Sequence, residues 1–222
     1  MIELALKKPP PYRILCLGSH ADDIEIGCGG TILKLLDDYR GKIIAHWIVL
    51  SASPERAREA KNSAEAFLRE AAEKTVAIES FPDSFFPYHS GGEIKNYLHQ
   101  LSRDFSPDLV FTHHRHDLHQ DHRLTAELTW NVFRDHWILE YEIPKYDADL
   151  GRPSVFVPLS EAICKAKIDY LLEHFKSQSQ RTWFSGETFA ALHRLRGIEC
   201  NSPSGYAEAF HCRKIVWSGP SK

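Results

Sequence analysis

Strand-like and helix-like segments alternate along the first 136 residues, and this alternation limits the possible folds more than any other feature of the sequence. Short apolar runs predict strands, and amphipathic runs with helical spacing predict helices. The expected strands are residues 13–17, 42–50, 75–80 and 109–112, and the expected helices are residues 31–39, 54–73, 94–105 and 119 or 120 to 134. Strands separated by helices of this length pair in parallel. The sequence therefore predicts an α/β fold, a three-layer sandwich around a mainly parallel, Rossmann-like sheet.

The remainder of the chain has a less regular pattern. Strands are expected at residues 138–143 and 215–217, and helices at residues 160–176 and 188–196. The 222 residues are enough to bury one sizeable core, and no linker rich in Gly or Ser divides them. We therefore expect a single domain over residues 1–222. Its Rossmann-like core would cover about 12–136, and the C-terminal part, about 137–222, would shape the substrate site.

The composition argues against several kinds of partner. The net charge is -3 and the sequence pI is near 6.5, so neither nucleic acid nor an anionic membrane is an expected partner. The longest apolar stretch, residues 43–50, is too short to cross a bilayer, and the first eleven residues lack the pattern of a secretion signal. Five cysteines without a Cys-x-x-Cys pair favour a reducing compartment. We expect a cytoplasmic protein without stable membrane insertion, and the sequence leaves its oligomeric state open, a homo-oligomer included.

Two short polar motifs, about a hundred residues apart, carry residues that bind metals. The first is His20-Ala21-Asp22-Asp23 and the second is His119-Gln120-Asp121-His122, and each follows an expected strand. Ligands of parallel α/β sheets bind at the carboxyl ends of the strands, so the fold should bring both motifs together. Zinc at catalytic sites takes three protein ligands and keeps one position open. We expect His20, Asp23 and His122 to bind Zn²⁺, and such N/O ligand sets also accept Fe²⁺ or Co²⁺.

The other polar residues of the motifs suit the hydrolysis of an amide. Asp22 lies beside a ligand but is not needed as one, so we expect it to act as the general base. His119 lies three residues before His122, on the same side of the first helical turn. As an imidazolium it would stabilise an oxyanion or protonate the departing nitrogen. Asp121 is expected to orient an imidazole, with His119 as the favoured partner.

A glycine cluster follows the first motif. Gly27, Gly29 and Gly30 precede the first expected helix, and we expect them to let the backbone turn sharply near the metal loop. Their spacing is not the Gly-x-Gly-x-x-Gly of a dinucleotide site.

In these motifs the sequence resembles the zinc-dependent de-N-acetylases of the LmbE and PIG-L type. The family's motifs usually read Ala-His-Pro-Asp-Asp, followed by glycines, and His-Pro-Asp-His, so both prolines are replaced here. The resemblance covers most of residues 12–217 and includes a Tyr-Ala-Glu-Ala-Phe segment at residues 206–210. It implies a hydrolase that removes the acetyl group from an N-acetylglucosamine-type sugar or glycoconjugate, with the ligands and proton-handling residues assigned above. It also implies that Arg56 and Asp83 contact sugar hydroxyls.

Other functions are compatible with the same residues. A metal-dependent amidase that acts on a thiol conjugate or another non-sugar amide would use an identical site. The presence of Asp22 and His119 argues against a non-catalytic metal- or small-molecule-binding module, and the shortage of further carboxylates argues against a two-metal phosphoesterase. The residues whose roles stay open at this point are His113, His114, His116, Asp117 and Glu208.

Overall fold

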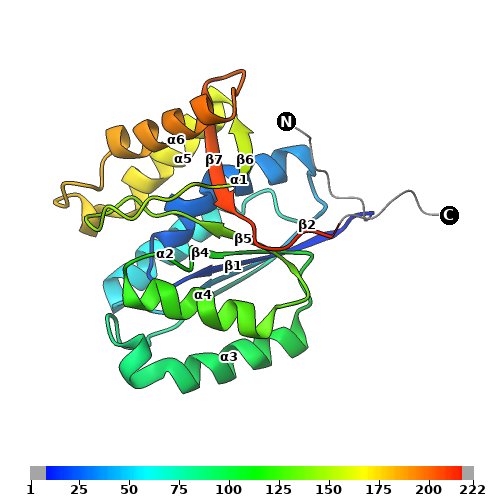
Figure 1. The fold of residues 1–222 in the computed structure, drawn as a ribbon, viewed down its shortest axis with the longest axis vertical. Helices are drawn as coiled ribbons and strands as arrows, with labels where there is room; N and C mark the ends of the chain where they lie inside the picture. The colour runs from blue at the N-terminus through cyan, green and yellow to red at the C-terminus, as the bar shows by residue number, and fades with distance from the viewer. Residues whose placement is uncertain (1–8, 217–222) are drawn as a thin grey trace.

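Side chains alternate between two buried faces along β1 (Tyr12–Gly18), the central strand of the fold. Ile14 and Cys16 belong to one hydrophobic cluster, and Leu15 and Leu17 belong to another on the opposite face. A strand that is apolar on both faces is stable only between two layers of helices. The computed structural model describes residues 9–216, and in it β1 lies in the middle of such a sandwich (Figure 1).

A seven-stranded sheet forms the middle layer, with the strand order β3-β2-β1-β4-β5-β7-β6. The strands from β3 to β5 in this order pair in parallel, and β7 runs antiparallel to both of its neighbours. The predicted three-layer sandwich with a mainly parallel sheet is therefore confirmed. The strands other than β1 are β2 (Ile43–Val49), β3 (Glu73–Ile78), β4 (Leu109–His113), β5 (Trp137–Tyr141), β6 (Val155–Leu159) and β7 (Tyr206–His211).

Helices cover both faces of the sheet. One face carries α1 (Asp23–Asp38), α2 (Pro54–Phe67), α5 (Glu161–His174) and α6 (Gly186–Glu199). The other carries α3 (Gly91–Asp104) and α4 (Gln120–Val132), which lie together on the far side of the sheet from α5 and α6 (Figure 1). A π-helical turn, η1 (Phe86–Ser90), precedes α3, and a 3-10 turn, η2 (Lys176–Gln178), follows α5. Within residues 9–216, no helix is both long and apolar enough to cross a lipid bilayer.

The C-terminal part is more regular than its sequence pattern indicates. That pattern does not predict β6 and β7, which extend the sheet beyond β5. β6 contains Pro158, which a strand tolerates at the edge of a sheet, where β6 lies. The expected strand at residues 215–217 is wrong for Ile215 and Val216, which lie outside any strand, and Trp217 lies outside the described residues. Helix α2 ends at Phe67, six residues earlier than expected, because β3 begins at Glu73.

Helix α1 begins at Asp23, eight residues earlier than expected, so the glycine cluster lies inside the helix. The interpretation of these glycines as a sharp turn is therefore wrong. A Cβ on Gly27 would lie 2.1 Å from Cδ2 of Tyr141, and one on Gly29 would lie 2.7 Å from Cε1 of Phe67. These positions need glycine because the helix backbone packs directly against neighbouring side chains.

Candidate metal centre and active site

The loops that follow β1 and β4 meet at the carboxyl edge of the sheet and bring the three expected ligands together. Nδ1 of His20 lies 3.1 Å from Nε2 of His122 and 3.4 Å from Oδ2 of Asp23. The third side of this triangle, from His122 Nε2 to Asp23 Oδ2, measures 3.5 Å. Donor atoms that bind a tetrahedral zinc ion at 2.0–2.1 Å lie about 3.3–3.4 Å apart. The spacing of the donor atoms therefore fits one zinc ion.

In both His20 and His122, the ring nitrogen that points away from the triangle lies next to a carboxylate. Nδ1 of His122 lies 2.9 Å from Oδ2 of Asp117. Nε2 of His20 lies 3.1 Å from Oδ1 of Asp83 and 3.3 Å from Oδ2 of Asp121. A neutral imidazole that donates its N–H to a carboxylate presents a lone pair on its other nitrogen. Both lone pairs then face the centre of the triangle, an arrangement that a cation stabilises and that two neutral rings alone would not favour.

The electrostatics of the triangle also favour a positive charge at its centre. Burial lowers the pKa of His20, but its hydrogen bonds to Asp121, Asp23 and Asp83 outweigh burial and raise this pKa well above the ordinary value. The pKa of His122 is lowered to about 4, chiefly by burial. The two shifts have opposite directions, so the surroundings favour a positive charge on His20 and disfavour one on His122.

Asp22 lies beside the triangle and has one free oxygen. It occupies the N-cap position of α1, yet its side chain accepts no capping hydrogen bond. Oδ1 accepts from Nη2 of Arg56 at 2.5 Å, and Oδ2 is buried without a hydrogen-bond partner among the described residues. Burial raises the pKa of Asp22, and the charge of the Arg56 guanidinium opposes this shift. Arg56 thus fixes the carboxylate and leaves Oδ2 available to a substrate or to water.

His119 lies at the rim of the site. It is the N-cap residue of α4, and its Nδ1 accepts from the backbone N–H of Asp121 at 3.3 Å. A neutral His119 therefore carries its proton on Nε2, which is a hydrogen-bond donor. The ring centroid lies 4.9 Å from that of His20 and 4.6 Å from that of His122. The pKa of His119 is lowered by burial and by the nearby His20, which favours the neutral donor form over an imidazolium.

The carboxylate of Asp121 contacts the ring of His20, whereas the expected partner is His119. Its carboxylate accepts from the backbone N–H groups of Ser84 and Phe86, at 2.6 and 3.1 Å, and contacts His20. The expected partner, His119, contacts only its backbone N–H in the hydrogen bonds of the described residues. The first turn of α4 directs this carboxylate toward the loop before η1, so it lies behind His20 and not beside His119.

Asp83 and Arg56, the two expected substrate contacts, differ in solvent exposure and in the partners they already have. The Asp83 side chain is 63% exposed, and besides His20 it accepts a hydrogen bond from the hydroxyl of Ser84 at 3.1 Å. The Arg56 side chain is 23% exposed and is already paired with Asp22. Both side chains therefore reach the site, Asp83 as an open acceptor and Arg56 as a partly covered donor.

Two residues whose roles the sequence left open belong to the site. Asp117 binds His122, as described above. His113 is buried, its Nε2 lies 3.2 Å from Oδ2 of Asp23, and its ring stacks on His122 with centroids 3.9 Å apart. The sequence signal for His113 is its position directly after the expected strand 109–112, and in the structure it is the last residue of β4, at the carboxyl edge of the sheet.

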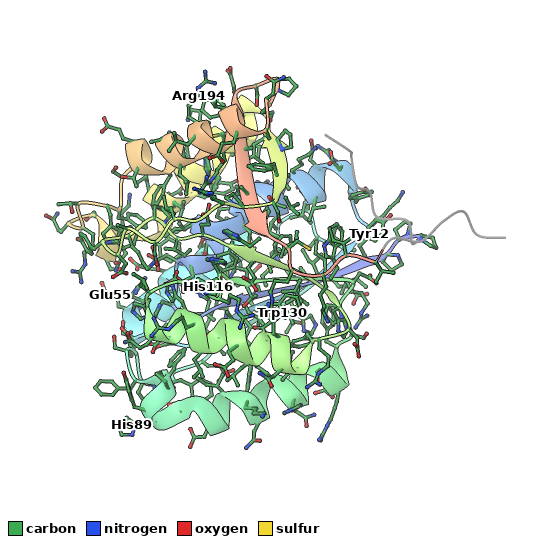
Figure 2. The ribbon with its side chains drawn as sticks, viewed as in Figure 1. Tyr12, Glu55, His89, His116, Trp130 and Arg194 are labelled. Carbon is green, nitrogen blue, oxygen red and sulfur yellow. The ribbon has the colours of Figure 1, made fainter. Side chains whose placement is uncertain are left out.

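The other three open residues have different surroundings. His114 pairs with Glu140 at 3.0 Å and stacks on His211 with ring centroids 3.7 Å apart. His116, labelled in Figure 2, is exposed. Glu208 is buried and pairs with Lys167 at 2.6 Å. None of these contacts reaches the three triangle residues.

Other residue combinations at this edge also bring potential metal ligands together. They are His20 with His119 and His122, Asp23 with His113 and His122, and His20 with Asp83 and Asp121. The first combination competes with the hydrogen bond that His119 accepts, and the third uses the outward nitrogen of His20. In the second, Nε2 of His113 already accepts from the backbone N–H of Ser19 at 3.0 Å. The triangle of His20, Asp23 and His122 avoids these three conflicts.

A comparison with protein families identifies the class of protein. Residues 15–133 match the PIG-L family, described as GlcNAc-PI de-N-acetylase. This segment is more than half of the chain. The chain therefore belongs to the PIG-L family, which confirms the resemblance seen in the two motifs.

Solved structures share the fold over nearly the whole chain. A conserved protein from Thermus thermophilus aligns with a TM-score of 0.73 and 22% identity over 94% of this chain and 98% of its own. N,N'-diacetylchitobiose deacetylase from Pyrococcus horikoshii aligns with a TM-score of 0.69 and 21% identity, over 90% of this chain and 83% of its own. GalB, the 4-carboxy-2-hydroxymuconate hydratase from Pseudomonas putida, aligns with a TM-score of 0.74 and 15% identity, over 95% and 100%. At these identities the likeness establishes the fold, and a fold alone does not determine the reaction.

Proposed function

We propose that this protein is a zinc-dependent hydrolase that removes the N-acetyl group from an N-acetylglucosamine-type sugar or glycoconjugate. The observation that carries the proposal is the triangle of donor atoms with a free carboxylate oxygen beside it. Membership in the PIG-L family supports the reaction type, and the relation in fold to a diacetylchitobiose deacetylase is consistent with an amino sugar as substrate.

His20, Asp23 and His122 would hold the metal, with Asp117 and Asp121 behind the two imidazoles. Zinc in this place would polarise the acetyl carbonyl and lower the pKa of water. The three donor distances of 3.1–3.5 Å support a tetrahedral ion with one position left for substrate or water. Fe²⁺ and Co²⁺ accept the same ligands, so reconstitution with each ion should accompany the activity tests.

Asp22 would act as the general base. Its Oδ2 is free, and Arg56 holds the other oxygen, so the carboxylate has a fixed direction and an available lone pair. It would take a proton from the attacking water and pass that proton to the amine nitrogen when the C–N bond breaks. The second proton of the water would also pass to the nitrogen, so water and amide would give acetate and the protonated amine.

His119 would stabilise the charge on the acetyl oxygen in the transition state. With Nδ1 occupied by the Asp121 N–H, its Nε2–H is the donor that remains for an oxyanion. Asp83 and Arg56 would contact sugar hydroxyls at the rim, Asp83 as acceptor and Arg56 through the donors that Asp22 leaves free.

Two other activities share the same requirements. An amidase for a thiol conjugate or another non-sugar amide would use identical residues. The fold shared with a hydratase adds a second candidate, the addition of water to a carbon–carbon double bond. The family match, described as GlcNAc-PI de-N-acetylase, favours the amino sugar.

The test is a substrate panel with the metal-loaded protein. N-acetylglucosamine, N,N'-diacetylchitobiose, sugar nucleotides, N-acetylated pseudodisaccharides, N-acetyl thiol conjugates and an unsaturated keto acid would be scored for amine release or loss of the double bond. We expect amine release from at least one amino sugar. The Asp22→Asn variant should lose this activity, which would show that the release depends on the proposed base. Turnover of the keto acid with none of the N-acetyl compounds would contradict the proposal.

We also propose that the protein is located in the cytoplasm. All five cysteines are free thiols, and Cys16, Cys28, Cys164 and Cys200 are buried. Free thiols are typical of a reducing cytoplasm.

A further inference from the structure

The buried ion pair of Lys167 and Glu208 forms hydrogen bonds with backbone groups near the middle of helix α1. The backbone N–H groups of Gly30 and Thr31 donate to Oε1 and Oε2 of Glu208, at 2.8 and 2.6 Å. In a regular α-helix these N–H groups would donate to carbonyls four residues earlier, the first of which is that of Ile26. Here the Ile26 carbonyl accepts from the ammonium of Lys167 at 2.6 Å. The two charged groups thus lie inside the hydrogen-bond ladder of α1.

The charges match the two parts of the helix that they face. The N–H groups that begin the second half of α1 carry partial positive charge, and the carboxylate of Glu208 accepts from two of them. The carbonyl that ends the first half carries partial negative charge, and the ammonium of Lys167 donates to it. The ion pair therefore contacts backbone groups at residues 26, 30 and 31 of the continuous helix α1, between its first turns and its C-terminal part.

The pair is fully enclosed and fully hydrogen-bonded. The Lys167 side chain is 1% exposed and that of Glu208 is 3% exposed. The three donor positions of the ammonium reach Ile26, Glu208 and His193, the last at 2.9 Å from Nζ to Nε2. A buried ion pair commonly adds no stability over apolar residues of similar volume. Stability alone is therefore a weak reason for a lysine and a glutamate in this place.

The first half of α1 carries two residues of the site. Asp22 is its N-cap and Asp23 its first residue, about 10 Å along the helix axis from Gly30. Gly27 fixes the distance of this segment from the sheet, because its backbone packs against Tyr141. That contact does not determine how far the segment is shifted along its own axis. The hydrogen bonds of Lys167 and Glu208 hold backbone groups of residues 26, 30 and 31 and so oppose such a shift.

We propose that Lys167 and Glu208 are positioning residues of the metal centre, which fix the first two turns of α1 along its axis and thereby place Asp22 and Asp23. The inference rests on the proposed function of these two aspartates. It concerns metal affinity as well as turnover, so it can be tested separately from the identity of the substrate.

The experiment compares Glu208→Gln, Lys167→Met and the double variant with the wild type. Zinc affinity would be measured by competition with a chromophoric chelator, and kcat and KM by amine release. Each single variant should bind zinc several-fold more weakly, by less than the roughly 10–100-fold expected when a group that contacts a ligand directly is lost. We expect kcat to fall and KM to stay nearly constant, and exchange of the Gly30 and Thr31 amide protons to accelerate.

The double variant separates positioning from stability. It leaves no unpaired buried charge, so its Tm should recover toward that of the wild type, while its zinc affinity and kcat stay low. Leu36→Ala is the matched control, because it removes packing from the second half of the same helix. It should lower Tm and keep zinc affinity per folded molecule. Glu208→Asp, which keeps the charge on a shorter side chain, should give an intermediate affinity if the other variants fail to fold.

The positioning role and the proposed function would be contradicted by different results. A folded double variant, or a folded Glu208→Asp variant, with the zinc affinity and kcat of the wild type would overturn the positioning role. A wild-type protein that binds zinc but releases amine from no compound would instead contradict the proposed function. In that case a weaker zinc affinity of the variants would still support the positioning role.

Discussion

Removal of the Asp117 carboxylate should weaken metal binding although Asp117 is not itself an expected ligand. Its Oδ2 lies 2.9 Å from Nδ1 of His122, and its Oδ1 lies 3.0 Å from Nζ of Lys145. Burial raises the pKa of Asp117, but the hydrogen bond and charge of His122, with the charges of His113 and Lys145, hold that pKa well below its ordinary value. The carboxylate is therefore ionised at every pH suitable for the assay.

The expected loss follows from these contacts. A hydrogen bond to a charged group contributes about 1.5–3 kcal/mol, and one between neutral groups about 0.5–1.5 kcal/mol. Asp117→Asn keeps an acceptor for His122 and loses the charge, so it should cost about 1–1.5 kcal/mol, or roughly tenfold in the Kd for zinc. Asp117→Ala frees the His122 ring to rotate and should weaken binding by about 10–100-fold. Lys145 keeps Asp147 and Asp149 as partners, so neither variant leaves its ammonium unpaired.

Competition with a chromophoric chelator at neutral pH measures both variants against the wild type. Asp147→Asn is the matched control, since Asp147 lies 3.7 Å from the same ammonium of Lys145 and makes no contact with His122 in the ion pairs of the described residues. Its zinc affinity should equal that of the wild type. If Asp117→Ala bound zinc as tightly as the wild type, the idea that this carboxylate orients a metal-binding imidazole would be refuted.

Three further predictions concern catalysis, packing and pH. Asp22→Asn should keep zinc bound and lower kcat by about 10²–10⁴-fold in steady-state amine release, and full activity would rule out its role as base. Gly27→Ala should lower the free energy of unfolding by roughly 1–3 kcal/mol, because its methyl group would lie 2.1 Å from the Tyr141 ring. Gly92→Ala, with no atom within 4 Å of the new Cβ, should raise the free energy of unfolding by up to about 1 kcal/mol. If urea denaturation gave the same free energy of unfolding for both variants, the close packing at Gly27 would be contradicted. Burial, followed by the charge of Lys167, lowers the pKa of His193 from 6.5 to about 2, so below pH 6.5 the unfolded chain binds a proton that the folded chain does not. Stability should therefore fall with decreasing pH by about 1.4 kcal/mol per unit from this group, and His193→Gln should remove that slope; an unchanged slope would refute the shift.

The parallel half of the sheet could be predicted because its strands are short, buried on both faces and separated by amphipathic helices. The pattern of Ile14 to Leu17, for example, needs no knowledge of distant residues. β7 could not be predicted in the same way, because its segment alternates alanines with Glu208 and aromatic residues. Its strand character depends on pairing with β5 and β6, which the local pattern does not specify.

The start of α1 could not be predicted from local preferences, because glycine disfavours helices by about 1 kcal/mol per residue. Three glycines in four residues therefore indicate a turn. In the structure these glycines lie in a helix, because Tyr141 and Phe67 contact the helix backbone at Gly27 and Gly29. A larger residue at either position would not permit this approach. Such contacts between distant segments are invisible in the sequence.

The triangle of His20, Asp23 and His122 could be predicted because each motif is local and follows a strand of a parallel sheet. The residues that orient the two histidines could not be assigned. The loop between β4 and α4 brings Asp117 to His122, and the direction of the first turn of α4 brings Asp121 to His20. Loop conformation sets both contacts, and residue spacing gives no direct measure of it.

The most direct test of the account is a crystal structure of the zinc-loaded protein with anomalous data at the zinc edge. We predict one zinc ion at about 2.0–2.2 Å from Nδ1 of His20, Nε2 of His122 and a carboxylate oxygen of Asp23. A zinc ion bound to the outward Nε2 of His20 together with Asp83 and Asp121, and no anomalous peak within the triangle, would contradict it.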